Sequence, residues 1–159
     1  MASLPKMEHC ALEELMPLVE ESFSMNRKVH FHPNGISMKP MLVSGRDSVL
    51  LSPIRDEIRK YDVVLYRYDN GKYVMHRVVK TQGDCYICLG DNTERFERVE
   101  ARQMLAVVTE FTRKGKTISA TSPLYRLYCH LWRPTRPLRI LYKRAKRLLR
   151  KMKSIWKAK

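Results

Sequence analysis

The chain has 159 residues with 31 Lys and Arg against 16 Asp and Glu, a formal net charge of +15. No apolar run approaches the roughly 20 residues that a transmembrane helix needs, so we expect no membrane-spanning segment. The basic excess alone suggests a protein that binds nucleic acid or a membrane surface. However, residues 1–110 contain 15 basic and 16 acidic side chains, whereas residues 111–159 contain 16 basic and none acidic. The sequence therefore predicts a nearly neutral body with a cationic tail.

The first residues lack a basic segment followed by an apolar one, so we do not expect a Sec-type signal peptide. The four cysteines do not have the spacing of a disulfide framework. Cys85 and Cys88 have the spacing of a zinc or redox motif, but in an alternating strand they point to opposite faces. No second Cys or His pair stands at ligand spacing. We therefore expect no metal and no cofactor, and thiols in a reducing compartment.

The predicted elements begin with a helix over Glu8–Met25, in which Pro17 would kink or split the helix. Its apolar residues recur at a helical period, at Leu12, Leu15, Met16, Val19 and Phe23. The alternating segment Lys28–His32 then predicts a strand, followed by turn residues. Further strand-like runs lie at Ser48–Ser52, Asp62–Tyr68, Tyr73–Lys80, Cys85–Leu89 and Met104–Phe111.

The connections between these runs are short, and Asn70-Gly71 between two alternating segments is typical of a β-hairpin. Several short strands with such turns predict an all-β fold, a sandwich or a barrel. We expect a helical lead-in at 1–27 and a β domain at 28–121. A connector and a cationic helix should follow at 122–159.

The last of these segments changes character from Ser122 onward. An irregular connector is expected first, because aromatic residues and prolines cluster there, at Tyr125, Tyr128, Trp132, Pro134 and Pro137. An amphipathic helix is then expected over Leu138–Lys157, with Lys and Arg on its polar side. Its narrow apolar stripe consists of Leu138, Leu141, Tyr142, Ala145, Leu148, Leu149, Met152, Ile155 and Trp156.

The most specific local segment is Gly35-Ile36-Ser37-Met38-Lys39-Pro40. Gly35 allows unusual backbone angles and Pro40 restricts them, so Ser37 is expected at a sharp, solvent-accessible turn. Such a position suits a nucleophile, although a serine between Gly and Pro is more often an ordinary loop hydroxyl. The segment needs support from the rest of the chain.

That support comes from five blocks that follow one another over about residues 29–111: Gly35–Leu42, Asp47-Ser48-Val49, Tyr61-Asp62-Val63-Val64, His76-Arg77-Val78-Val79 and Gly90-Asp91-Asn92. In this order they resemble the signal peptidase and LexA-like serine peptidase superfamily. Arg46 stands where the family usually joins Gly directly to Asp, so we expect a reshaped loop there. A His rather than a Lys at the base position is similar to the branch that includes the endoplasmic reticulum and archaeal enzymes.

The resemblance implies a β-barrel or folded-sheet serine endopeptidase that cleaves a signal or leader segment through an acyl-enzyme, with small residues preferred just before the scissile bond. Ser37 would be the nucleophile and His76 the base, because an imidazole with a pKa of about 6.5 can activate a serine hydroxyl near neutral pH. Asp91 is the first choice for the acid that orients the imidazole, and Glu94 or Glu97 could serve instead. The Ser37 backbone N–H would form the oxyanion hole, with Gly35 and Met38 along the substrate cleft.

His76 also has a simpler interpretation. Strand alternation places it on the face of Val74 and Val78, which is where a half-buried core histidine would lie. Histidines 30 and 32 are two residues apart on one strand face, and we assign them no role.

The cationic helix at residues 138–159 has three interpretations. An interfacial membrane anchor fits its apolar stripe, with Arg144, Arg147, Lys151 and Trp156 at the lipid surface and roughly 1 kcal/mol from each cation. Docking on an acidic partner or on the body is the second interpretation, and nucleic-acid binding is the least favoured.

For the protein as a whole, we expect a peripheral membrane protein on the cytoplasmic face, whose partners are a precursor peptide and a membrane surface. A non-catalytic membrane- or nucleic-acid-binding adaptor on the same fold is the alternative function.

Overall fold

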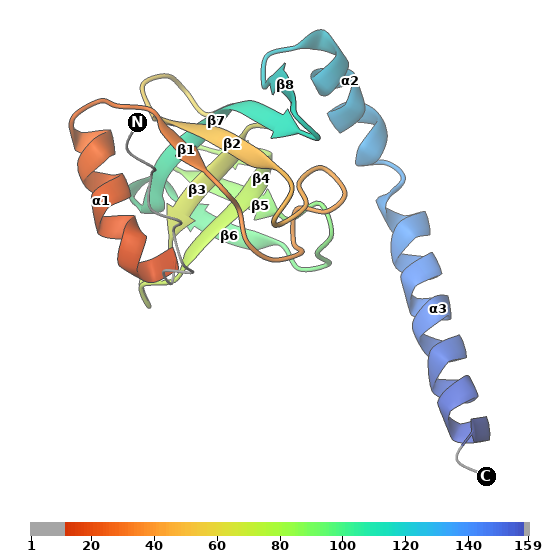
Figure 1. Ribbon diagram of the computed structural model, residues 1–159. Helices are drawn as coiled ribbons and strands as arrows, with labels where there is room; N and C mark the ends of the chain where they lie inside the picture. The colour runs from red at the N-terminus through yellow and green to blue at the C-terminus, as the bar shows by residue number, and fades with distance from the viewer. Residues whose placement is uncertain (1–11, 158–159) are drawn as a thin grey trace. The chain divides into compact units, whose positions relative to one another are not determined.

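The computed structural model describes residues 12–157, without the side chains of residues 12–14, 143, 151 and 153–157. The chain divides into two compact units, Met1–Ala120 and Thr121–Lys159 (Figure 1). The first unit contains all the strands and one helix, and the second contains two helices.

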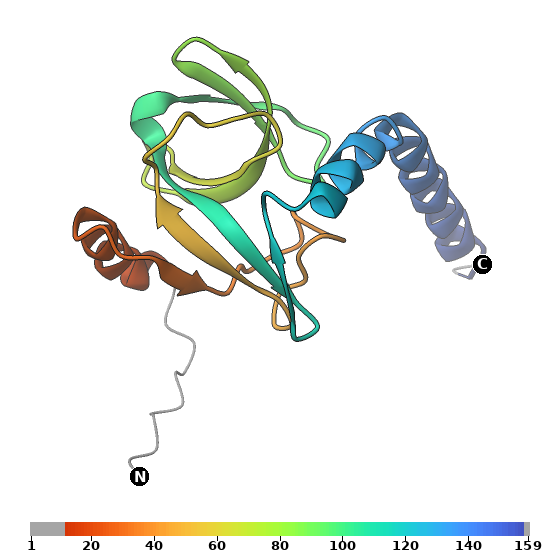
Figure 2. The same ribbon diagram turned by 90° about the horizontal axis from the view of Figure 1, so that it is seen from above.

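The first unit is built on one antiparallel sheet of eight strands, so the predicted mainly β fold is confirmed. The strand order is β1-β2-β7-β3-β4-β5-β6, and β8 pairs with β7. The sheet curls strongly but does not close into a barrel (Figure 2). The strands are β1 Val29–Phe31, β2 Ser48–Pro53, β3 Val63–Arg67, β4 Tyr73–Gln82, β5 Cys85–Leu89, β6 Glu97–Glu100, β7 Met104–Arg113 and β8 Lys116–Ser119.

Alternation along these strands creates the core. Residues that pair across neighbouring strands share a face, and Val64 pairs with His76 while Tyr66 pairs with Val74. On this face a buried cluster forms within the curl of the sheet, from Ile58, Val64, Tyr66, Val78, Cys88 and Val99. The histidine of β4 is therefore held among core side chains on a regular strand.

Two strands, β6 and β8, lie outside the sequence prediction. Their segments, Glu-Arg-Val-Glu and Lys-Thr-Ile-Ser, are short and mainly polar. Each pairs with one strand only, β6 with β5 and β8 with β7. A strand at a sheet edge needs little apolar surface, which explains the weak signal.

The predicted hairpin at Asn70-Gly71 joins β3 to β4. The Tyr68 N–H donates to the Lys72 carbonyl, and the Gly71 N–H donates to the Tyr68 carbonyl. Only Gly71 has a positive φ, +84°. This is a three-residue loop with glycine at its left-handed position, and it fixes the register in which β3 meets β4.

Helix α1 spans Leu12–Ser24 and buries Met16 and Val19. Pro17 lies inside the helix without splitting it. Residues 8–11 of the predicted helix lie outside the described part of the chain. The Tyr73 hydroxyl donates a hydrogen bond to Glu20 at 2.8 Å, which connects α1 to the first residue of β4.

The second unit contains α2, Pro123–Trp132, and α3, Arg136–Lys157. The expectation of an irregular connector is wrong for residues 123–132. Ser122 occupies the N-cap and Pro123 begins the helix, where a proline loses no helical hydrogen bond. Within the described residues, no helix combines the length and the apolar character needed to cross a bilayer.

Candidate active site

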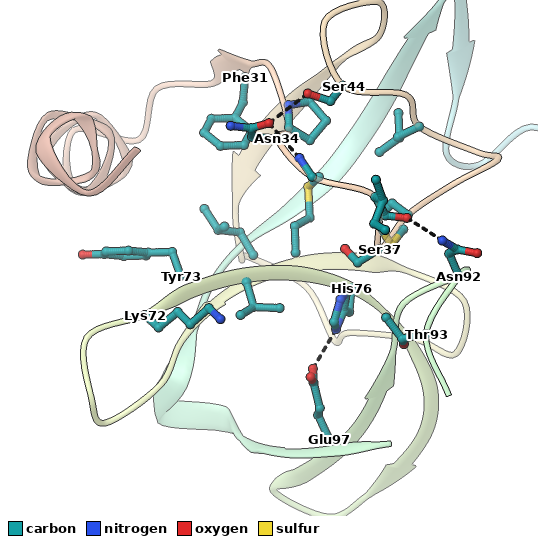
Figure 3. A pocket seen from close by; sticks show the side chains of 18 of the residues that line it. Phe31, Asn34, Ser37, Ser44, Lys72, Tyr73, His76, Asn92, Thr93 and Glu97 are labelled. Carbon is teal, nitrogen blue, oxygen red and sulfur yellow. Dashed lines mark hydrogen bonds and ion pairs between the residues drawn. The ribbon is translucent and has the colours of Figure 1, made fainter. Parts of the chain in front are cut away.

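A cleft of about 510 Å³ opens in the first unit beside β4 (Figure 3). Gly35, Ser37 and Met38 line it from the loop after β1, and His76 and Glu97 line it from the sheet. Much of the remaining wall is apolar, with Phe31, Ile36, Leu42, Leu65, Val74 and Met75. Of the residues predicted from sequence to form the site, the structure thus brings together Gly35, Ser37, Met38, His76 and Glu97, one of the two alternative acids.

The loop that contains Ser37 is held from two sides. On one side, Asn34 Oδ1 accepts hydrogen bonds from the Gly35 N–H at 2.8 Å and from the Ser44 hydroxyl at 2.9 Å. On the other side, the Asn92 N–H donates to the Ser37 carbonyl at 2.7 Å, and its side-chain amide donates to the Ile36 carbonyl. Gly35 has φ +92°, a conformation that a residue with a side chain rarely adopts.

The N–H and the hydroxyl of Ser37 form no hydrogen bond with any other residue that the structure describes. The side chain is half-buried at the cleft. Both groups are therefore available to a ligand, the hydroxyl as a nucleophile and the N–H as a donor to a developing oxyanion.

His76 is buried on β4, and its Nδ1 lies 2.6 Å from Glu97 Oε2. The same carboxylate oxygen accepts a hydrogen bond from the buried hydroxyl of Tyr66. A neutral imidazole that donates its Nδ1 hydrogen to Glu97 keeps a lone pair on Nε2. That lone pair is what a general base needs.

The other ring nitrogen of His76, Nε2, lies close to Gly90. A Cβ atom at Gly90 would lie 2.9 Å from His76 Nε2 and 2.8 Å from the Ser37 carbonyl oxygen. The ring nitrogen and the Ser37 backbone are thus both next to a single point at the start of the Gly90-Asp91-Asn92 turn. Ser37 lies beside the imidazole, with Glu97 at the other end of the ring (Figure 3).

The structure corrects the first choice of acid. Both oxygens of Asp91 accept hydrogen bonds from Arg77, at 2.9 and 2.7 Å, and both side chains are almost fully buried. The Arg77 guanidinium also donates to the Tyr61 carbonyl. Because Arg77 follows His76 on a strand, it points to the opposite face. Asp91 therefore pairs with Arg77, and its expected role beside His76 is wrong.

The acid beside His76 is Glu97, one of the two alternatives. It is the first residue of β6, and its side chain reaches back to β4. Glu94, the other alternative, is exposed and is not among the residues that line the cleft.

Burial of Glu97 by itself would raise the pKa of its carboxyl group. The hydrogen bonds from His76 and Tyr66 outweigh that effect, so the pKa of Glu97 is lowered below its usual value. Burial, followed by the hydrogen bond to Glu97, raises the pKa of Tyr66 strongly, which keeps its hydroxyl a donor. At neutral pH Glu97 is therefore a negative charge held in place by hydrogen bonds.

The loop containing Arg46 is stabilised locally. Arg46 Nε and Nη2 each donate to the fully buried Asp47 at 2.7 Å, and the N–H groups of Val43 and Lys114 donate to the same carboxylate. The pKa of Asp47 falls to about 2, mainly because of the Arg46 hydrogen bonds. Arg46 thus serves as the ion-pair partner of Asp47.

Tyr66 and Asn92 are site residues that sequence reasoning missed. Tyr66 looks like an ordinary strand aromatic, but the register of β3 with β4 places it on the His76 face. Asn92 belongs to the block Gly90-Asp91-Asn92, in which each residue has its own function: close approach, pairing with Arg77, and anchoring of the Ser37 loop.

No group of three or more His, Cys, Asp or Glu side chains suited to a metal ion occurs in the described part of the chain. Cys88 is buried in the core cluster, and burial raises the pKa of its thiol to about 12. Cys85 is half-buried and accepts a hydrogen bond from Arg98.

A scan of protein-family models and a search of curated proteins each found no match to this chain.

Proposed function

We propose that the protein is a serine endopeptidase that uses Ser37, His76 and Glu97 to cleave a signal or leader segment of a precursor protein. The observation that carries the proposal is the imidazole of His76, bonded through Nδ1 to Glu97 and with Nε2 next to the Ser37 backbone. This is the relation that a triad requires, because the acid fixes the tautomer and stabilises the imidazolium that forms.

In the proposed reaction, His76 takes the Ser37 proton as the oxygen attacks the scissile carbonyl. The Ser37 N–H donates to the resulting oxyanion, and the imidazolium then protonates the leaving amine. Water, activated by the same imidazole, hydrolyses the acyl-enzyme. Glu97 stays ionised throughout, which its lowered pKa favours.

An extended peptide is the substrate form that the cleft suits best. β4 pairs with β3 from Tyr73 to Arg77, but its pairing with β5 begins only at Arg77. Among the described residues, no strand pairs with the second edge of β4 between Tyr73 and His76. An unpaired edge beside an apolar cleft supports binding by strand addition, with main-chain hydrogen bonds leading the scissile bond toward Ser37.

The test is cleavage of a mixture of extended peptides, followed by mass spectrometry of the products. Ser37→Ala should lower turnover by at least about 10⁴-fold, because the nucleophile is lost. Ser52→Ala is a matched control, since Ser52 is also half-buried but lies on β2 and does not line the cleft. Equal cleavage by Ser37→Ala and the wild type would contradict the proposal and favour the non-catalytic adaptor.

The proposal includes a peripheral position on the anionic, cytoplasmic face of a membrane, reached through residues 138–159. Arg144 and Arg147 are exposed on α3, which also exposes Leu138, Leu141, Tyr142, Leu148, Leu149 and Met152. The side chains of Lys151 and Trp156, the other residues assigned to this surface, lie outside the described part. Exposed cations beside an apolar stripe suit an anionic interface.

Co-sedimentation with vesicles of phosphatidylcholine and phosphatidylglycerol tests this part. Arg144→Gln with Arg147→Gln should weaken binding about tenfold or more at low salt, since each cation contributes roughly 1 kcal/mol near the surface. Arg55→Gln with Arg59→Gln removes two exposed arginines of the first unit as a control. Equal binding by both double variants would contradict the membrane assignment.

A further inference from the structure

Helix α2 has an exposed apolar surface of its own, in addition to the apolar stripe of α3. Leu124, Leu127 and Leu131 are 79%, 53% and 61% exposed. Their spacing of three and four residues places them on one face of the helix, while Tyr125 and Cys129 on another face are buried. Three neighbouring leucines in water are unfavourable, so this face is suited to an apolar partner.

The leucine face borders a shallow hollow of about 490 Å³. The hollow is formed entirely within the second unit, by Leu124, Leu127, Tyr128, Leu131, Trp132 and Thr135. The rings of Tyr128 and Trp132 stack at 5.7 Å, and the Arg139 guanidinium lies 3.4 Å from the centre of the Trp132 ring. An apolar hollow therefore adjoins aromatic rings and a cation, a combination typical of the boundary between acyl chains and headgroups.

The charge of this unit indicates the kind of partner. Residues 121–159 contain 13 Lys and Arg and no Asp or Glu. Repulsion between such units disfavours a second copy of the chain as the occupant. Nucleic-acid phosphates would match the charge but would leave the leucines exposed. An anionic bilayer satisfies both features, with phosphates for the cations and acyl chains for the leucines.

We propose that α2 is a second membrane-contacting element, whose Leu124, Leu127 and Leu131 insert into the interfacial layer of an anionic bilayer. The hollow takes up part of an acyl chain, and Arg139 meets the phosphate above it. The inference rests on the membrane part of the proposed function and is independent of the peptidase part.

The two tryptophans of the chain make a direct test possible, because one lies in each helix of this unit: Trp132 ends α2 and Trp156 lies in α3. Full-length Trp156→Phe leaves Trp132 as the single reporter. On phosphatidylcholine and phosphatidylglycerol vesicles with brominated acyl chains, we expect its emission to shift to the blue and to be quenched. Trp132→Phe, which keeps Trp156, reports on α3 in the same way.

A double variant separates apolar insertion from charge attraction. Leu124→Gln with Leu131→Gln keeps helix propensity and charge but removes apolar surface. Partitioning onto the vesicles should fall about tenfold. The deficit should persist near 1 M salt, where the Debye length is about 3 Å and attraction between charges is screened. The control is Leu18→Gln with Met25→Gln in the first unit, because these two side chains have a similar exposure, 62% for Leu18 and 54% for Met25. This variant should bind as the wild type does.

The outcomes distinguish this inference from the proposal on which it rests. Quenching of Trp156 without quenching of Trp132 overturns the role of α2 and leaves the α3 assignment standing. Quenching of neither tryptophan overturns both. Wild-type partitioning by Leu124→Gln with Leu131→Gln also overturns the inference. If circular dichroism shows that the double variant loses helix, the Trp132 reporter with native leucines decides the question.

Discussion

The two faces of β4 carry pairs of a basic side chain and a carboxylate that look alike but differ in chemistry. His76 and Arg77 are neighbours in sequence, and each meets one carboxylate: His76 Nδ1 lies 2.6 Å from Glu97, and Arg77 Nη2 lies 2.7 Å from Asp91. The His76 and Arg77 side chains are 6% and 5% exposed, whereas Glu97 is 20% exposed and Asp91 only 4%. Alternation along the strand separates the two pairs completely.

The comparison shows that a short contact between a basic side chain and a carboxylate does not by itself identify a catalytic pair. A guanidinium stays protonated at every physiological pH, so the Arg77–Asp91 pair cannot exchange a proton. An imidazole can, because its unperturbed pKa lies near neutrality. Only the pair at the cleft combines a titratable partner with access to Ser37. The buried pair instead holds the turn that carries Gly90 and Asn92.

The largest effect should come from Glu97→Gln. The amide can still accept a hydrogen bond, but it no longer selects the Nδ1–H tautomer or stabilises the imidazolium, so turnover should fall about 10⁴-fold. The free energy of unfolding of Glu97→Gln should change much less than the activation free energy does. Peptide cleavage rates with a parallel urea titration measure both quantities. Retention of more than a tenth of wild-type turnover would remove Glu97 from the mechanism.

Asp91→Asn should give the opposite result. It leaves the Arg77 charge buried without a counter-charge, which we expect to cost about 3 kcal/mol of unfolding free energy. Turnover of the protein that remains folded should stay within about tenfold of wild type, since Asp91 does not contact His76. If Asp91→Asn lost activity without losing stability, the division between the two faces of β4 would be wrong.

Gly90→Ala tests how closely the Gly90-Asp91-Asn92 turn approaches Ser37 and His76. The new Cβ would lie 2.8 Å from the Ser37 carbonyl and 2.9 Å from His76 Nε2, so one of them must move. A displacement near 1 Å should lower turnover about 100-fold. Gly71→Ala is the control, because its Cβ meets nothing within 4 Å and only its positive φ is strained. That variant should lose about 1 kcal/mol of stability and no activity.

The smallest effect should come from Tyr66→Phe. Loss of one donor to Glu97 should raise the pKa of its carboxyl group, because the hydrogen bond from Tyr66 helps to lower it. A carboxyl pKa that is lowered in the folded state adds stability above its unfolded value, and this is lost as the pH falls through the folded value. The acid limb of the stability profile should therefore move to higher pH, with turnover about threefold lower. Carboxyl titration by NMR gives the pKa; an unchanged Glu97 pKa would contradict this role for Tyr66.

The sequence was sufficient for much of the fold. Alternating segments such as Tyr73–Lys80 and Cys85–Leu89 predicted β4 and β5 because each must bury one face against a core. The polar edge strands β6 and β8 carried no such signal. Helix α2 was also missed, since its aromatic residues and the nearby prolines resemble a connector more than an amphipathic helix.

For the candidate site, the sequence by itself determined the types and order of the chemical groups: a serine at a Gly-to-Pro turn, a histidine on a strand, and acids after the next strand. Only the tertiary structure decided which acid serves which base. Glu97 is 21 residues from His76, and its position depends on how β5 and β6 pair and on where the sheet curls. Strand alternation fixes which face a side chain points to, but the partner it meets there depends on long-range packing that no local pattern encodes.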